Sequence, residues 1–135
     1  MGIKSKKPAR LGEIKAQELP PPQISFSLKY LSNSNNKFIC TAQDAQYFLK
    51  LLERLKALCQ MKSMDLLASR SSALRCHPIN WPETTESGFG IPKGVGDDVA
   101  VQFEISMNSH GRVHGFFIGE IFYVVWLDPF HRLYS

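Results

Sequence analysis

Alternating apolar and polar residues dominate the C-terminal part of this sequence. Apolar residues occupy every second position from 101 to 107, with Gln102, Glu104 and Ser106 between them. Two further apolar runs, 112–118 and 121–127, flank Gly119-Glu120. A period of two is typical of a half-buried strand, and a two-residue loop that begins with glycine suits a type II′ turn. The pattern predicts three consecutive strands with one buried and one open face.

The N-terminal half has a helical pattern instead. Thr41 and Asp44 have the spacing of a capping box, and a core-facing stripe at helical spacing follows them, consisting of Ala45, Phe48, Leu49, Leu52, Leu55 and Leu58. A second helix is predicted over 64–74 with Ser63 as its cap, and short strands are predicted near 24–28 and 75–79. The fold class is therefore α+β, with two N-terminal helices packed on one face of a small antiparallel sheet of about four strands.

Length and composition set the domain organisation. The 135 residues suffice for a single core. Residues 1–22 are basic, poor in large apolar residues and closed by Pro20-Pro21-Pro22, so we expect an arm there. Residues 23–135 are expected to form one α+β domain. Its segment 80–97 is rich in proline and glycine, and such long loops are often functional.

Charge and cysteine content limit the possible partners and the cellular compartment. The net charge of +4 permits contact with nucleic acid without requiring it. The three cysteines, Cys40, Cys59 and Cys76, are widely spaced and odd in number, which favours a reducing cytoplasm over a disulfide framework. No apolar run reaches the roughly 20 residues of a membrane span, and none follows the basic N-terminus as in a secretory signal. We expect a cytoplasmic protein with no membrane partner.

Strand register decides which polar residues meet. A turn at 119–120 pairs residue 116 with 123, 114 with 125 and 112 with 127, and a three-residue loop at 109–111 pairs 106 with 114 and 104 with 116. This register turns Phe117, Trp126 and their apolar neighbours toward the helices. The opposite face then carries a polar set, consisting of Gln102, Glu104, Ser106, Arg112, His114 and Tyr123.

Such a set has the groups for acid–base chemistry on a phosphodiester. Glu104 or His114 could take a proton from a ribose hydroxyl, and Arg112 could stabilise charge on the phosphate. The alternative is an ordinary solvated sheet face, since sheets commonly show polar residues to water.

The C-terminal segment is similar to a known family. An arginine opens one strand in Arg112-Val113-His114-Gly115, an apolar strand covers 122–127, and the chain ends His131-Arg132-Leu133-Tyr134 before Ser135. In these features, and in the order of helices followed by strands, the chain resembles the RelE/ParE superfamily of small bacterial toxins. The resemblance covers about the last quarter of the chain. The closing spacing is one residue shorter than the family's His-Arg-x-x-Tyr, and the chain is longer than typical members.

The resemblance implies an activity and a set of residues. RelE-like members cleave mRNA in the ribosome without a metal or cofactor, by attack of the ribose 2′-hydroxyl on the adjacent phosphate. By this resemblance Arg112 holds the scissile phosphate, His131 and Tyr134 transfer protons or stack on a base, and Glu104 is a base. The implied partners are mRNA on the ribosome and an acidic antitoxin protein.

Two alternatives remain from the sequence. ParE-like members share the fold but inhibit gyrase, so a non-catalytic protein that docks on a host protein through Trp81, Phe89 and Phe130 is the second hypothesis. A zinc site that uses Cys76-His77 with His110 or His131 is the third, although these residues lack the close ligand pairing of structural zinc sites.

Overall fold

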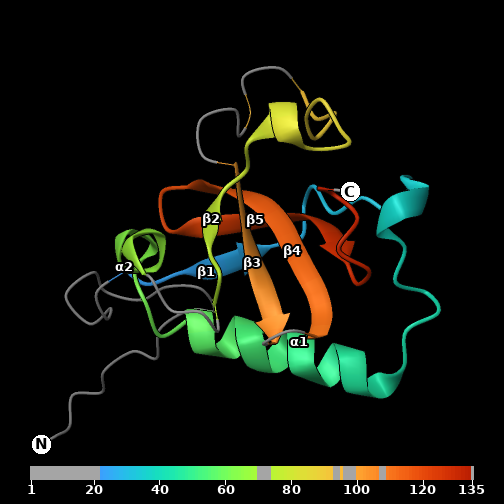
Figure 1. Cartoon of the computed structure of the whole chain (residues 1–135). Coiled ribbons are helices and arrows are strands. Elements are labelled where there is room, and N and C mark those ends of the chain that lie inside the picture. The colour runs from blue at the N-terminus through green and yellow to red at the C-terminus, as the bar shows by residue number, and fades with distance from the viewer. Residues whose placement is uncertain (1–21, 70–73, 93–94, 96–99, 107–108, 135) are drawn as a thin grey trace, which may run out of the picture.

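The computed structural model describes residues 22–69, 74–92, 95, 100–106 and 109–134. The predicted arm lies outside these residues, apart from Pro22. In chain order the elements are β1 (Ser25–Ser27), a 3₁₀ helix (Asn36–Phe38), α1 (Ala45–Leu58), α2 (Ser63–Ala68), β2 (His77–Pro78), a second 3₁₀ helix (Trp81–Glu83), β3 (Ala100–Ser106), β4 (Ser109–Ile118) and β5 (Ile121–Asp128). These elements make an α+β fold, as the sequence predicts (Figure 1).

The sheet is larger than predicted and mixed. Within the described residues it has five strands in the order β1-β5-β4-β3-β2. β1 runs parallel to β5, and the other neighbouring strands are antiparallel. The prediction of an antiparallel sheet of about four strands is therefore wrong in strand number and in the direction of β1. β1 and β5 are far apart in the chain, with α1, α2, β2, β3 and β4 between them, so no tight turn forces them to be antiparallel. Hydrophobic alternation carries no information on strand direction.

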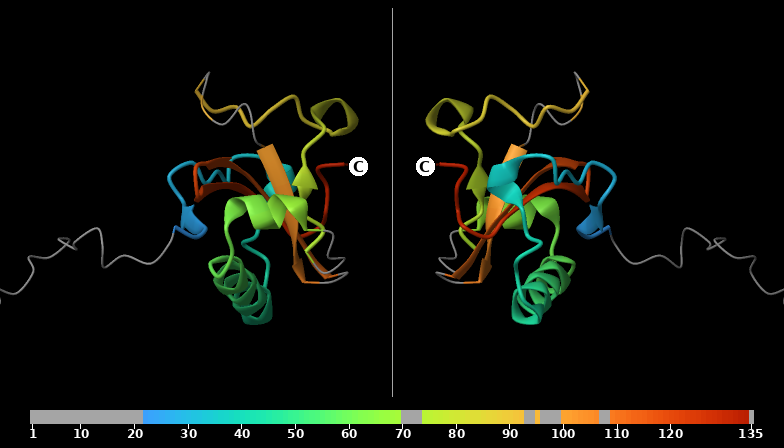
Figure 2. Two further views of the ribbon diagram at one scale, coloured as in Figure 1. Left: turned by 90° about the vertical axis from the view of Figure 1, so that its left-hand side faces the viewer. Right: turned by 90° about the vertical axis from the view of Figure 1, so that its right-hand side faces the viewer.

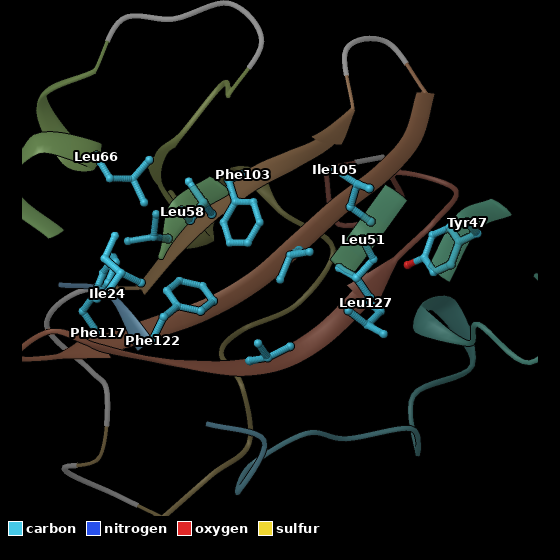
Figure 3. Packing of buried hydrophobic residues seen from close by; sticks show 13 residues of the cluster. Ile24, Tyr47, Leu51, Leu58, Leu66, Phe103, Ile105, Phe117, Phe122 and Leu127 are labelled. Carbon is cyan, nitrogen blue, oxygen red and sulfur yellow. The ribbon is translucent and has the colours of Figure 1, made fainter. Parts of the chain in front are cut away.

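One face of the sheet packs with residues from α1 and α2. The helix-side core consists of Ile24, Tyr47, Leu51, Leu58, Leu66, Val101, Phe103, Ile105, Val113, Phe117, Phe122, Val124 and Leu127 (Figure 3). Phe122 contacts Phe103 and Phe117 edge to face, with ring centroids 5.4 and 5.0 Å apart. Glu120 joins this layer to the hairpin turn, because its carboxylate accepts hydrogen bonds from the amide and hydroxyl of Ser63 at 2.7 Å.

Helix α1 buries a face that matches the predicted one only in part. Its cap is Asp44, whose Oδ1 accepts the Tyr47 amide at 3.1 Å, in place of the predicted Thr41. Leu58 of the predicted stripe is buried and Leu55 packs against the core, but the other buried residues of α1 are Tyr47 and Leu51, and Phe48, Leu49 and Leu52 of the stripe are exposed. Both sets have helical spacing. Periodicity locates apolar faces, but the packing of the helix decides which one is buried.

The second face of the sheet is covered rather than open. The loop-side core consists of Phe38, Ile79, Ala100, Phe116, Val125, Trp126 and Leu133, with Tyr30, Trp81, Phe89, Ile91, Val95, Tyr123 and Tyr134 packed against it. Figure 2 shows the segment around the second 3₁₀ helix on the opposite side of the sheet from α1. The predicted open face is thus wrong, since loops supply the second layer. Gln102 and Glu104 are buried beneath it.

The β4–β5 hairpin has the predicted turn and an unpredicted bulge. Ile118 pairs with Ile121 and Phe116 with Tyr123, as expected. The register then shifts at Gly115, so His114 pairs with Trp126 and Arg112 with Asp128. A Cβ on Gly115 would lie 2.1 Å from the Tyr123 carbonyl oxygen, so only glycine fits this approach. The bulge moves Trp126 from its predicted place in the helix-side core to the loop-side core.

The β3–β4 pair is displaced by four residues from the predicted register. Glu104 pairs with Arg112 and Gln102 with His114, in place of the predicted Glu104–Phe116 and Ser106–His114 pairs. A shift of four residues, an even number, keeps each side chain on its predicted face but changes its neighbour. The shift therefore creates a direct carboxylate–guanidinium pair that the predicted register lacked.

The second helix and second strand are shorter than predicted. α2 ends at Ala68 and is preceded by Lys62 at its cap position, so Ser63 is the first helical residue rather than the cap. The predicted helix extended to residue 74, and its part over 70–73 lies outside the described residues.

Candidate functional site

A pocket of about 430 Å³ opens where β3, β4 and the C-terminal turn meet. Its lining consists of Arg75, Glu104, Ser109, His110, Gly111, Arg112, Pro129, Phe130 and His131. It gathers two guanidinium groups, two imidazoles and one carboxylate. Of the five residues proposed from the sequence, Glu104, Arg112 and His131 line this pocket, while His114 and Tyr134 do not.

Glu104 and Arg112 form an ion pair at the base of the pocket. Both are buried, and Arg112 Nη1 donates to Glu104 Oε1 at 3.0 Å. The half-exposed Arg75 places its Nε 3.4 Å from Glu104 Oε2. Burial lowers the pKa of Arg112, and the Glu104 carboxylate opposes that shift. The pair thus holds one guanidinium at a fixed position facing the pocket.

Neighbouring backbone groups fix the position of Glu104. Its amide donates to the Leu74 carbonyl at 2.8 Å. Arg54 of α1 donates from Nε to the carbonyls of Glu104 and Ile105 at 2.9 and 3.0 Å. β3 is therefore tied on two sides at the residue that carries the carboxylate.

His131 enters the pocket from the C-terminal turn. Its backbone has φ +55, and its amide donates to the Asp128 carbonyl at 3.2 Å. Burial lowers the pKa of His131, and the charge of Arg112 lowers it further. The lowered pKa favours a neutral imidazole near pH 7, which suits a group that accepts a proton.

His110 also lines the pocket, a role that was not predicted from the sequence. It was assigned to a turn, whereas it lies in β4 with φ +64. Its Nδ1 lies 2.8 Å from Ser106 Oγ and 3.0 Å from Ser109 Oγ. Gly111 follows, where a Cβ would lie 1.9 Å from the Asp128 carbonyl oxygen. The signal available in the sequence was the His110-Gly111 dipeptide itself, because glycine is common where the chain needs a positive φ.

The pocket also collects the unusual backbone conformations. Among the described residues, the non-glycine residues with positive φ are Arg75, His110 and His131, at +41, +64 and +55. All three line this pocket. Positive φ outside glycine costs free energy and is found preferentially at functional sites. This coincidence is independent of the charge of the pocket.

His114 lies outside the pocket and is fully buried. Its Nε2 donates to Asp128 Oδ2 at 2.9 Å, and its ring packs edge-on against Phe38 and Trp126. Burial lowers the pKa of His114 despite the carboxylate beside it. The prediction that His114 faces solvent is therefore wrong, because the loop-side core covers its side chain.

Tyr134 is likewise engaged elsewhere. Its hydroxyl accepts the Asn80 amide at 3.0 Å, and its ring lies 6.0 Å from that of His77. The aromatic residues of the host-binding hypothesis differ in their exposure. Trp81 and Phe89 pack edge to face on each other and on Trp126, whereas Phe130 is 57 % exposed at the pocket.

Comparison of the chain with protein-family models, with curated proteins and with solved structures finds no match. The resemblance to the RelE/ParE superfamily therefore rests on the residues alone. Within the described part of the chain, no three His, Cys, Asp or Glu side chains are grouped so that they could hold a metal ion, so the zinc hypothesis has no support there. No helix in that part is long and apolar enough to cross a membrane.

Proposed function

We propose that this chain is a small toxin-like protein that cleaves mRNA at the ribosome as a metal-independent endoribonuclease. The observation that carries the proposal is the meeting of Glu104, Arg112 and His131 in one pocket, together with Arg75 and His110. Guanidinium groups recognise phosphate through paired N–H donors, and imidazoles transfer protons near neutral pH. The three residues with positive φ at the same pocket give further support.

The pocket residues suit transfer of the phosphate to the neighbouring hydroxyl. Arg112 and Arg75 would bind the scissile phosphate, and neutral His131 would take the proton of the 2′-hydroxyl as its oxygen attacks phosphorus. The bond to the 5′-oxygen breaks, and protonated His110 would supply that oxygen with a proton. The products are a 2′,3′-cyclic phosphate and a 5′-hydroxyl. Glu104 would orient Arg112 and remains a second candidate for the base.

The ribosome and the acidic antitoxin rest on the family resemblance. An acidic partner is compatible with the chain's net charge of +4. The cytoplasmic location is likewise a proposal, which follows from the cysteine pattern.

A short RNA oligonucleotide and its copy with 2′-deoxy sugars test the reaction. We expect cleavage of the RNA with a 2′,3′-cyclic end in a translation extract with intact ribosomes. If the purified protein also cleaves free RNA, that cleavage should persist in EDTA. The deoxy copy should remain intact because it lacks the nucleophile. His131→Ala and Arg112→Ala should each reduce the rate, whereas Glu53→Ala on the outer surface of α1 should not. Cleavage of the deoxy copy, or full activity in both pocket variants, would contradict the mechanism.

The second candidate is a non-catalytic inhibitor that docks on a host protein. Its supporting observation is the exposed apolar stripe of α1, Phe48, Leu49 and Leu52, the last 62 % exposed. Exposed apolar patches mark interaction sites in many soluble proteins. Under this candidate, toxicity on expression survives His131→Ala and is lost in Leu52→Glu. The ribonuclease proposal predicts the reverse.

A further inference from the structure

The carboxylate of Asp128 closes the C-terminal turn that carries His131. Asp128 is the last residue of β5 and is fully buried. Its Oδ1 accepts the Arg132 amide at 2.8 Å, and its Oδ2 accepts the Leu133 amide at 3.1 Å. Its own carbonyl accepts the His131 amide at 3.2 Å. Three consecutive amides of the turn thus end on one residue.

His114 holds this carboxylate from below. Its Nε2–H points at Asp128 Oδ2 at 2.9 Å, and the neighbouring rings of Phe38 and Trp126 exclude water. Among the described residues Nδ1 of His114 has no hydrogen-bond partner. A neutral ring with its proton on Nε2 satisfies the carboxylate, and the lowered pKa of His114 agrees with that state.

The strained backbone of His131 lies inside this closed turn. A residue other than glycine keeps a positive φ only where surrounding contacts enforce it. Here the contacts come from Asp128, which accepts hydrogen bonds from the amide of His131 itself and from the amides of the next two residues. Without them the turn can relax to negative φ, which would move the imidazole relative to Arg112 and Glu104.

We infer that His114 and Asp128 form a buried positioning pair that holds His131 in the pocket. The catalytic part of this inference rests on the proposed function, whereas the positioning part does not. The pair touches no substrate; it acts through the C-terminal turn. His114 was one of two candidates, with Glu104, for taking a proton from the substrate, and its burial keeps it from contacting a substrate.

The charged groups around His131 affect its pKa, so a change in the His114–Asp128 pair can be measured through the titration of His131. The groups that face it are Arg112 and Asp128 on the two strands below, Glu104 on β3 and His77 on β2. Asp128 and Glu104 raise the pKa of His131, whereas Arg112 and His77 lower it. Loss of the Asp128 charge should therefore lower the pKa of His131 further and displace its ring.

NMR titration of the histidine rings in the full chain tests the pair directly. In the wild type we expect His114 to be neutral with its proton on Nε2 near pH 7. In Asp128→Asn the titration midpoint of His131 should fall, with a change in its ring shifts, and His114→Phe should also change those shifts. Val124→Ala, which removes buried volume from the helix-side core, is the matched control and should leave both unchanged.

A wild-type His114 ring without a proton on Nε2 would overturn the inference, and this measurement depends on no variant folding. Unchanged His131 midpoint and shifts in folded Asp128→Asn and His114→Phe would also overturn it. These outcomes do not depend on whether the chain cleaves RNA.

The kinetic arm separates positioning from chemistry. If wild-type protein cleaves RNA, Asp128→Asn should lower the rate by about 100-fold, as expected for a misplaced reacting group. The acid limb of its pH profile should move with the midpoint of His131, while Val124→Ala retains both rate and profile. A rate loss with an unmoved profile would indicate a merely structural role. Absence of cleavage in the wild type would refute the proposed function and leave the NMR result standing.

Discussion

Two polar pairs lie side by side on the loop-side face of the sheet, but their surroundings differ. Glu104–Arg112 joins β3 to β4, and His114–Asp128 joins β4 to β5. The first pair lines the pocket and has a half-exposed guanidinium, that of Arg75, beside it. The second pair is sealed by Phe38, Trp126 and Leu133. Arg112 and His114 are thus only two residues apart in β4, yet Arg112 can contact a ligand, whereas His114 can only stabilise the surrounding structure.

The difference comes from what covers each pair. Aromatic side chains from the N-terminal loops and from Trp126 close over His114, with Phe38 stacked on Trp126 at 4.4 Å. Over Arg112 the chain turns away at Pro129 and leaves a cavity. A buried pair without solvent tolerates no loss of one partner, because the other is left as an uncompensated polar group. A pair at a pocket can exchange one partner for a ligand.

Removal of the sealed carboxylate should have the largest effect. Asp128→Ala leaves His114 and the amides of Arg132 and Leu133 without an acceptor, so the free energy of unfolding should fall by about 3–5 kcal/mol. Chemical denaturation measures this loss. Glu53→Ala, which removes an exposed pair with Lys50, should change it by at most about 0.5 kcal/mol. A loss below 1 kcal/mol in Asp128→Ala would show that the turn is held by other contacts.

Neutralising the pocket carboxylate should cost less. Glu104→Gln keeps the shape and a hydrogen bond to Arg112 but removes the charge, so we expect a loss of about 1.5–3 kcal/mol in unfolding free energy. Glu86→Gln is the matched control, because the Lys37–Glu86 pair is partly exposed and should be worth about 1 kcal/mol or less. Inorganic phosphate should raise the melting temperature of Glu104→Gln more than that of the wild type, since Arg112 then lacks its carboxylate. Equal stabilisation would place phosphate elsewhere.

Acidification should expose the sealed histidine as a stability determinant. The pKa of His114 is lowered in the folded chain, so between its ordinary value of about 6.5 and the folded value the unfolded state binds more protons. The contribution of neutral His114 to the free energy of unfolding is fully present above about pH 6.5. It falls as the pH drops, by at most about 1.4 kcal/mol per pH unit for this group.

Denaturation between pH 7.5 and 5 measures this slope. His131 adds to the slope in the same direction, because its pKa is also lowered. His114→Phe removes the contribution of His114, and His131→Ala removes that of His131. A slope that His114→Phe leaves unchanged would contradict the sealed neutral state.

The smallest effect concerns Tyr134, beyond both pairs. Tyr134→Phe removes the hydroxyl that accepts the Asn80 amide, so the free energy of unfolding should fall by about 1 kcal/mol. RNA cleavage should be unchanged because Tyr134 does not line the pocket. Tyr30→Phe, whose ring lies 5.8 Å from that of Phe116 in the same core, is the control for removal of a hydroxyl. Loss of cleavage without loss of stability would return Tyr134 to the site, as the family resemblance implies.

Much of the site was accessible from local patterns. Alternation placed Glu104, Arg112 and His114 on one sheet face, and the structure agrees, because a register error of four residues, an even number, preserves the face. The bulge at Gly115 was not accessible, since an apolar run reads the same with or without an extra residue. It changed the face of Trp126 and brought Asp128 opposite Arg112. Asp128, the residue on which the turn depends, lies just after the predicted strand 121–127, and the local pattern gave it no role.

The sequence by itself determined the strands, the hairpin turn at Gly119-Glu120 and the α+β class. These depend on residue periodicity and on local backbone preferences, which act over a few residues. Only the tertiary structure decided which face of α1 is buried, that β1 joins β5 in parallel, and that loops cover the second face of the sheet. Those outcomes depend on contacts between residues far apart in the chain, where several packings satisfy the same pattern and the whole core selects one of them.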